Sequence, residues 1–186
     1  MFFKKHKMEY DLLYTKYQEL SEKELLQSKE LIELRKLKGM EKELIFLQDL
    51  LKRYTIMGLE KNKFDEEYYV CLFASENSFD LYLKNPNRHH PFPRLYGTIF
   101  TRSSTNSIAR CKIEDMFAED KHAGNGTILL NYAKKYLKSI GVRCIYGELS
   151  FVDKDNFDVL EKFYKYNDFK VTFNEERTSG SIEITI

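Results

Sequence analysis

The sequence of 186 residues has no tryptophan, only three prolines and three cysteines, and no excess of either charge. Its 30 basic and 29 acidic residues are mixed along the chain, so we expect neither a nucleic-acid-binding face nor a field that steers polyanions. No apolar run is long enough to span a bilayer, and residues 1–7 carry too short an apolar run for a signal peptide. The sequence therefore predicts a cytoplasmic protein that binds no membrane.

The few cysteines and histidines argue against a metal centre. Cys71, Cys111 and Cys144 are isolated, odd in number and lie in predicted strands, which is typical of buried thiols in a reducing compartment. His89 and His90 are adjacent in a proline-flanked loop, with no cysteine or carboxylate at ligand spacing. We expect both histidines to be exposed, although they could line the mouth of a substrate site. No metal is expected.

The first 60 residues are rich in leucine, lysine and glutamate and predict helix. Apolar residues three and four apart form a short heptad seam at Leu37, Met40, Leu44, Leu47, Leu51 and Tyr54. Leu13, Tyr17 and Leu20 begin a second seam, which Glu24 and Gln27 interrupt. Gly39 predicts a kink or a junction between two helices. These helices either pack on the domain that follows, which the shortness of the seams favours, or form a coiled coil that dimerises the protein.

From residue 66 the pattern changes to strands. Residues 68–74 and 79–83 flank a polar turn and predict a hairpin, and residues 94–101 predict another strand. Near the C-terminus, Asp155 or Asn156 can cap a helix whose apolar stripe includes Phe163 and Tyr164. Residues 169–173 and 182–186 then predict an antiparallel hairpin.

The most informative stretch is a strand ending at Ala118, followed by a turn that contains Gly124 and Gly126. Glycines allow a sharp bend and keep side chains away from an approaching ligand. The helix predicted over residues 127–140 would direct its free N–H groups into this turn, and its dipole favours an anion. Gly141 ends that helix and residues 142–150 predict a strand. The result is a βαβ unit with two parallel strands and a phosphate cradle between strand and helix.

These motifs, in this order, resemble the GNAT superfamily of acyl-CoA N-acyltransferases over about residues 108–186, and more weakly over 64–107. Lys121-x-x-Gly124-x-Gly126 matches the family's turn, with lysine in place of the usual glutamine or arginine. Phe163-Tyr164 followed by Phe169 matches the end of the family's last helix, with Asp168 in place of the usual glycine. The resemblance implies an α/β fold: a mixed, mostly antiparallel twisted sheet with a central parallel βαβ unit, preceded here by a helical N-terminal segment.

The resemblance also implies a site for acetyl-CoA as acyl donor. Backbone N–H groups of Ala123 to Thr127 would hold the pyrophosphate. The exposed edge of the preceding strand, at Met116 to Ala118, would pair with the pantetheine arm. The residues implied in coenzyme binding are Met116, Phe117, Ala118, Lys121, His122, Ala123, Gly124, Asn125, Gly126 and Thr127.

Acyl transfer to an amine also needs a proton donor for the thiolate and a base for the ammonium. The resemblance gives the donor role to Tyr164, whose position beside an apolar stripe is equally consistent with a core residue. Glu114, Asp115 and Glu148 are candidate bases, and strand alternation predicts that Glu114 and Asp115 lie on opposite faces. A carboxylate on a strand is more often solvated or ion-paired.

We therefore expect a helical segment over residues 1–60 and a GNAT-like domain over residues 64–186. The predicted function is an acyl-CoA-dependent N-acyltransferase that transfers acetyl to a primary amine. The acceptor could be a polyamine, an antibiotic, a lysine or a protein N-terminus, because variable loops build acceptor pockets. The alternative is a catalytically silent GNAT-fold module that binds a protein partner through its N-terminal helices.

Overall fold

The computed structural model describes residues 2–88, 91–100, 109–120 and 122–186, with side chains from residue 12 onward. The chain divides into two compact units, Met1–Gln48 and Asp49–Ile186. Among the described residues, no helix has the length and apolar character needed to cross a membrane.

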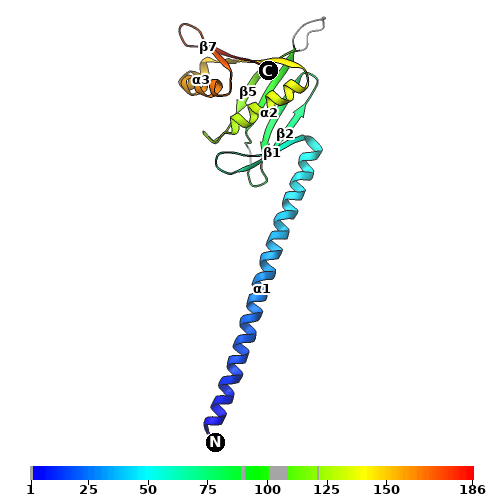
Figure 1. Cartoon of the computed structure of the whole chain (residues 1–186), viewed down its shortest axis with the longest axis vertical. Helices are drawn as coiled ribbons and strands as arrows, with labels where there is room; N and C mark the ends of the chain where they lie inside the picture. The colour runs from blue at the N-terminus through cyan, green and yellow to red at the C-terminus, as the bar shows by residue number, and fades with distance from the viewer. Residues whose placement is uncertain (1, 89–90, 101–108, 121) are drawn as a thin grey trace. The chain divides into compact units, whose positions relative to one another are not determined.

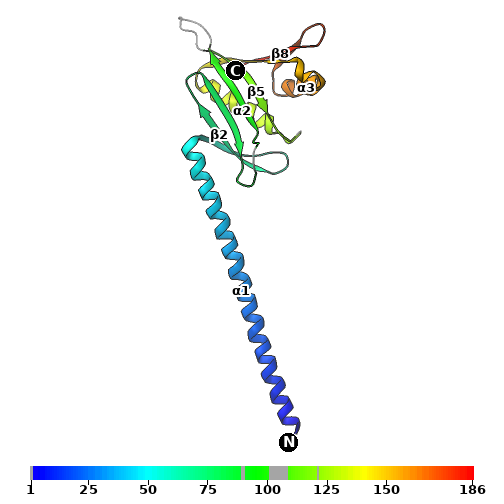
Figure 2. The same ribbon diagram turned by 180° about the vertical axis from the view of Figure 1, so that it is seen from behind.

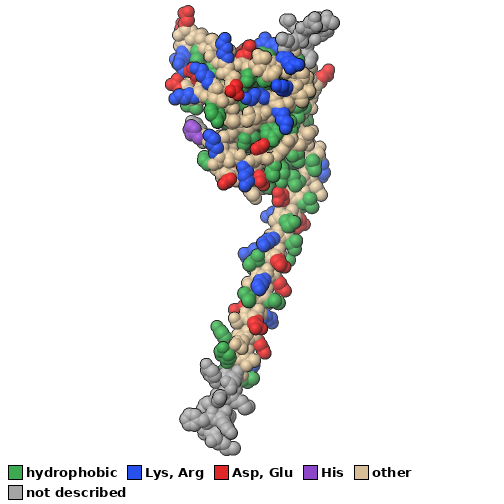
Figure 3. Space-filling view, viewed as in Figure 1, with side chains coloured by type: hydrophobic (Ala, Val, Ile, Leu, Met, Phe, Trp, Pro, Cys, Tyr) green, Lys and Arg blue, Asp and Glu red, His purple; other side chains and the backbone are tan. Residues whose placement is uncertain are grey.

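The first unit is formed by helix α1 (Phe2–Arg53) up to Gln48, and the helix continues without interruption through Gly39 (Figure 1). The break predicted at Gly39 is therefore wrong. One glycine inside a helix costs only about 1 kcal/mol, and strong helix formers such as Leu37 and Met40 surround it. Figure 3 shows hydrophobic, basic and acidic side chains alternating along the helix.

The second unit is built on one mixed sheet of eight strands in the order β1-β2-β3-β4-β5-β6-β8-β7. Their bounds are β1 Thr55–Lys61, β2 Glu67–Ala74, β3 Ser78–Lys84, β4 Arg94–Phe100, β5 Ala109–Phe117, β6 Val142–Leu149, β7 Lys170–Phe173 and β8 Gly180–Thr185. Among the strands that the structure describes, β5 and β6 run parallel, and every other neighbouring pair is antiparallel. The predicted fold class, a mostly antiparallel sheet around a central parallel βαβ unit, is confirmed.

Two α-helices and one 3₁₀ helix follow β5 in the described part of the chain. Helix α2 (Asn125–Ser139) connects the parallel strands, and Gly141 ends it with a left-handed φ of 84° as predicted. A 3₁₀ helix η1 (Phe151–Asn156) precedes helix α3 (Phe157–Tyr166), which packs on β7. Asn156 occupies the N-cap position of α3 but makes no side-chain cap bond, in contrast to the predicted cap. Figure 2 shows the sheet and these helices from behind.

The core lies between α2 and one face of the sheet. Alternating residues of β2 and β3, among them Val70 and Leu81, are buried together with Leu129, Leu130 and Leu137 of α2. Such alternation is typical of strands covered on one face. Cys71 and Cys111 are buried and Cys144 is partly buried, and all three thiols are free, as expected.

One strand was missed from the sequence. Helix α1 ends at Arg53 and Thr55–Lys61 forms β1, although helix was expected to continue to Leu59. β1 pairs with β2 along its length, and a register shift lies between Ile56 and Gly58. The pairing of an edge strand depends on its neighbour, which a leucine-rich local pattern does not reveal.

Candidate functional site

The candidate site begins where the two parallel strands part. β5 and β6 pair from Ala109 to Ile113, whose partner is Gly147, and no pair follows among the described residues. β5 continues to Phe117 and stays paired with β4. From Glu114 onward β5 therefore has one edge that β6 does not occupy. Met116 and Ala118 are partly buried along this segment, and Phe117 is exposed.

The turn after β5 leads into α2 through Gly124, which has φ 89° and ψ 0°. This left-handed conformation favours glycine because a side chain would clash with the backbone. Among the described residues, no acceptor lies opposite the N–H groups of Gly124, Asn125, Gly126 and Thr127. The N–H group of Ala123 was also expected to face the pyrophosphate, but it donates to the carbonyl oxygen of Asp120 at 3.2 Å. We call these four residues, Gly124 to Thr127, the cradle.

Gly126 has a different reason to be glycine from the one expected. A Cβ built on Gly126 would lie 2.9 Å from Cζ of Phe163 and 3.5 Å from Cβ of Ala118. The space left by the missing side chain is thus filled by an aromatic ring of α3 and is not open to a ligand. The amide of Asn167 also reaches the first turn of α2, with Nδ2 3.4 Å from Oγ1 of Thr127. Helix α3 therefore packs directly against the cradle.

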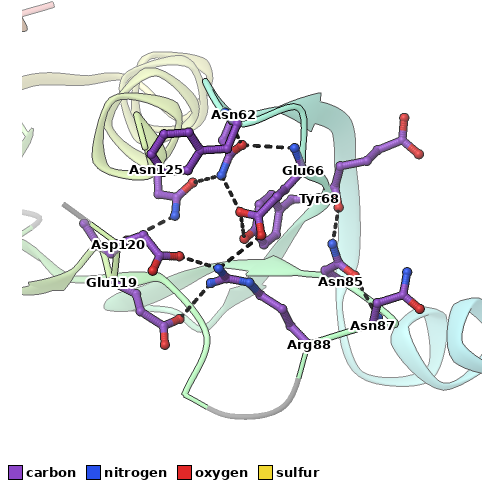
Figure 4. A network of polar contacts seen from close by, with 12 residues as sticks. Asn62, Glu66, Tyr68, Asn85, Asn87, Arg88, Glu119, Asp120 and Asn125 are labelled. Carbon is purple, nitrogen blue, oxygen red and sulfur yellow. Dashed lines mark hydrogen bonds and ion pairs between the residues drawn. The ribbon is translucent and has the colours of Figure 1, made fainter. Parts of the chain in front are cut away.

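A chain of buried amides holds the cradle in place (Figure 4). Asn125 is 1% exposed, and its Nδ2 donates to the carbonyl oxygen of Ala118 at 3.3 Å. Its Oδ1 accepts from Nδ2 of Asn62, in the turn between β1 and β2, at 3.3 Å. The amide of Lys63 donates to the carbonyl oxygen of Ala123 at 2.8 Å. The β1–β2 turn therefore fixes both the start of α2 and the end of β5.

An arginine and three carboxylates lie next to this chain (Figure 4). Arg88 binds Glu66 at 3.1 Å, Glu119 at 3.2 Å and also Asp120. Asn62 donates to Glu66 at 2.7 Å, which connects the two sets of contacts. With one positive and three negative groups, the cluster is net negative beside the cradle. Arg88 thus ties together three segments that are far apart in the sequence.

Sequence reasoning missed Asn62, Glu66 and Arg88. Asn62 contacts a residue 63 positions away, and nothing in the local pattern indicates such a contact. Of the predicted residues, Lys121 lies outside the described part of the chain, as do His89 and His90. His122 is exposed and has a left-handed φ of 68°.

Tyr164 lies on α3, one residue after the ring that packs on Gly126. It is 6% exposed and contacts the rings of Phe163 and Phe169. Burial, followed by the charges of Asp153 and Asp115, raises the pKa of the phenol to about 12. No acceptor for the hydroxyl lies among the described residues, where every fully buried side-chain oxygen has a partner. The phenol oxygen therefore keeps some contact with solvent.

The predicted carboxylates lie on one face of the sheet. In β5, a register shift opposite Tyr96 and Gly97 leaves Glu114 without a Cα partner. Glu114 pairs with Lys112 at 3.2 Å and Asp115 pairs with Arg94 at 3.1 Å.

Lys112 and Arg94 belong to the same face by strand alternation, so this β-bulge brings both carboxylates to that face. The prediction that they point to opposite faces is wrong, because the extra residue of the bulge resets the alternation. Glu148, which is more exposed than Glu114, also contacts Lys112, at 3.5 Å. Two of the predicted bases thus share one ammonium group.

Other features of the described residues do not add to this site. No group of three or more His, Cys, Asp or Glu side chains among them could hold a metal ion. A shallow pocket of about 360 Å³ lies beside the start of α3 and is lined by Lys154, Asp155, Phe157, Asp158, Glu176 and Arg177. Within it, Arg177 is already paired with Asp158 at 2.6 Å and with Glu161 at 2.8 Å.

Comparison with known proteins yields distant structural similarity. No family model and no curated protein matches the chain. The chain is similar to the structure of a candidate GNAT-family acetyltransferase from Desulfovibrio desulfuricans, with 14% identity and a TM-score of 0.43 over 59% of this chain and 69% of that one. It is also similar to a candidate streptothricin acetyltransferase from Bacillus anthracis in complex with acetyl coenzyme A, with 17% identity and a TM-score of 0.40 over 72% and 82% of the two chains. Similarity at this level assigns no residue role.

Proposed function

We propose that the chain is an acyl-CoA-dependent N-acyltransferase that transfers an acetyl group from acetyl-CoA to a primary amine. The observation that carries the proposal is the free edge of β5, which runs directly into a turn with four N–H groups that lack an acceptor among the described residues. Unpaired amides at a helix N-terminus suit a diphosphate, and a free strand edge suits the amide groups of a pantetheine arm. The two features lie in sequence order on one segment.

In the proposal, the cradle binds the diphosphate of the coenzyme and residues 116–118 pair with its pantetheine arm. Asn125 connects these two parts, because its side chain binds the carbonyl oxygen of Ala118 while its own amide belongs to the cradle. The chain of contacts through Asn62 would hold the amides in position before the ligand arrives. Such preorganisation reduces the free-energy cost of binding.

The reaction would be a direct attack of the amine nitrogen on the thioester carbonyl carbon. A carbon–nitrogen bond forms, the carbon–sulfur bond breaks, and the departing thiolate takes a proton. Tyr164 is the proposed donor of that proton, because its raised pKa keeps the phenol protonated and its oxygen retains solvent contact. General acid catalysis of this kind contributes about 100- to 10,000-fold in rate.

The attacking amine must lose a proton, since an alkylammonium has a pKa of about 10.4 and is protonated at neutral pH. Glu114 is the preferred acceptor of the two carboxylates that share Lys112, because it lies on the segment of β5 that β6 leaves free. Glu114→Gln should lower kcat by about 100-fold and Glu148→Gln by less than about threefold. Glu183→Gln, a paired glutamate of β8, is the matched control. Equal losses in all three variants would remove the assignment of Glu114.

Calorimetry with acetyl-CoA tests binding, and thiol release in the presence of a panel of amines tests turnover. Binding is expected for the intact protein and should be lost in Gly126→Glu. This substitution would also displace Phe163, so folding of the variant is checked by circular dichroism. No binding to the intact protein, or unchanged binding in a folded variant, would reject the proposed site.

The many exposed leucines of α1 favour a second candidate function, that of a silent binding module. In that case residues 1–60 engage a protein partner and the GNAT-like domain does not turn over substrate. Thiol release with any amine counts against this function. Capture of a defined partner by the full chain, without turnover, would favour it.

A further inference from the structure

Helix α1 carries many large apolar side chains on its surface. Between Leu12 and Ile45, the exposed ones are Leu12, Leu13, Tyr14, Tyr17, Leu20, Leu25, Leu26, Leu31, Ile32, Leu34, Leu37, Met40, Leu44 and Ile45. Each is 51–71% exposed. Helices in proteins gain most of their stability from packing of an apolar face, so a helix with this surface requires a partner.

Eight of these fourteen residues fall into two heptad seams, and the other six, Leu12, Tyr14, Leu25, Leu26, Ile32 and Ile45, lie outside them. In the first, Tyr17 and Leu31 occupy a positions, and Leu20 and Leu34 occupy d positions. In the second, Leu37 and Leu44 are at a, and Met40 and Leu47 are at d. The seams meet between Leu34 and Leu37, where the phase changes by one residue. Coiled coils accommodate such phase changes by local changes in winding.

The charged residues beside these seams complement a parallel second copy of the same helix. In a parallel, in-register pair, each g position faces the e position five residues later on the other helix. Lys36 then faces Glu41, and Glu30 faces Arg35. The other charged g positions, Lys16, Lys23 and Glu43, face the uncharged Ser21, Ser28 and Gln48. No like-charge pair arises at these positions.

We propose that α1 pairs with α1 of a second copy of this chain as a parallel, in-register coiled coil. The apolar area is sufficient, because each exposed leucine contributes on the order of 100 Å², and a stable interface needs about 800 Å² from each partner. Glu24 and Gln27 interrupt the first seam at an a and a d position. They would weaken the dimer at that layer, because two copies of Glu24 face each other.

The orientation and register are tested by disulfide cross-linking of the full chain. Met40→Cys places a thiol at a d position, where the two copies lie side by side in a parallel pair. Gly39→Cys is the matched control, because Gly39 is next to Met40 in the helix but lies at an outer c position, where an added Cβ would have nothing within 4 Å. Both variants carry Cys144→Ser to remove the partly buried native thiol. Cross-linking of Met40→Cys and not of Gly39→Cys is expected, and equal cross-linking or none would overturn the proposal.

The interface is tested by sedimentation equilibrium of full-length variants. Leu37→Glu with Leu44→Glu should raise the dimer dissociation constant at least about 100-fold, because four buried leucines are lost per dimer. Ile45 is equally exposed but lies off the seam, so Ile45→Glu should change the dimer dissociation constant by less than about threefold. Glu24→Leu should tighten the dimer. A monomeric wild-type chain at high micromolar concentration, or equal effects on and off the seam, would overturn the proposal and leave a different protein as the partner of α1.

A charge exchange sharpens the test. Lys36→Glu and Glu41→Lys should each weaken the dimer by about two- to fivefold, and the double exchange should restore it. Failure of the double variant to recover would overturn the parallel register. None of these measurements depends on coenzyme binding or turnover, so the proposal stands or fails apart from the proposed function.

Discussion

The two halves of the candidate site are built in different ways. The cradle consists of backbone N–H groups, and contacts from the buried Asn62, the backbone of Lys63 and the ring of Phe163 hold it. The carboxylate half consists of side chains on one face of the sheet, where Glu114 and Glu148 share Lys112. Under the proposed function, the binding half is therefore fixed before the coenzyme arrives, whereas the proposed base must first leave its ion pair. This difference predicts that mutations separate binding from turnover.

The largest separation is expected for Tyr164→Phe. Loss of the phenolic proton should reduce kcat by about 1,000-fold and leave coenzyme affinity unchanged, because the ring still packs against Phe163 and Phe169. Tyr166→Phe, on the same helix and 77% exposed, is the control. Steady-state kinetics and calorimetry measure the two quantities. Full activity in Tyr164→Phe would show that this residue serves only the packing of the core.

The same residue has an effect on stability at high pH. Its folded pKa of about 12 lies above the ordinary value of 10.0, so the stability it contributes is complete below pH 10. That contribution is lost as the pH rises toward 12, because ionisation is then easier in the unfolded chain. Tyr164→Phe should therefore lose less stability than the wild type between pH 10 and pH 12 in urea unfolding. It also follows that Tyr164 does not limit the rate below about pH 11.

The next largest effect concerns the backbone of the cradle. Gly124→Val should reduce coenzyme affinity about 100-fold, because a β-branched residue resists the left-handed conformation and moves the amides. Gly141→Val is the matched control, since Gly141 has a similar φ of 84° at the other end of α2. Both variants should lose a similar free energy of unfolding, and only the first should lose affinity. Equal affinities would show that the conformation at Gly124 serves folding only.

A smaller effect is expected from the amide chain that supports the cradle. Asn62→Ala leaves Oδ1 of Asn125 without its donor in a buried site, which should cost about 1–3 kcal/mol of stability. Coenzyme affinity should fall about tenfold as the amides lose their fixed geometry. Asn85→Ala removes an exposed hydrogen bond from the side-chain amide to the carbonyl oxygen of Glu67. This control should change neither the stability nor the coenzyme affinity by much. Calorimetry and urea unfolding measure both effects.

The smallest effect tests the charge beside the cradle. Glu119→Gln reduces the negative charge around Arg88 and should raise affinity for the anionic coenzyme by about twofold at low salt. The gain should disappear at about 1 M salt, where the Debye length is about 3 Å. A loss of affinity would show instead that the ion pair to Arg88 positions the turn.

The comparison of the two halves also explains what the sequence reveals. The glycine turn, the parallel pair and Gly141 depend on local backbone preferences, so they are readable from residue order. Asp168 illustrates this, since it has a left-handed φ of 69° at the position where the GNAT pattern usually has glycine. The β-bulge at Glu114, the β1 strand and the contact from Asn62 depend on partners distant in sequence. These features could not be predicted from the local sequence. Because the β-bulge was not predicted, the two carboxylates were assigned to opposite faces of the sheet.

The central claim is that the N–H groups of the cradle bind the diphosphate of an acyl-coenzyme A. Labelling with ¹⁵N-glycine reduces the amide spectrum to the eight glycines of the chain. Titration with coenzyme A should shift the signals of Gly124 and Gly126 strongly and leave those of Gly39 and Gly141 in place. A titration in which Gly124 and Gly126 stay unchanged at saturating coenzyme A would contradict the account.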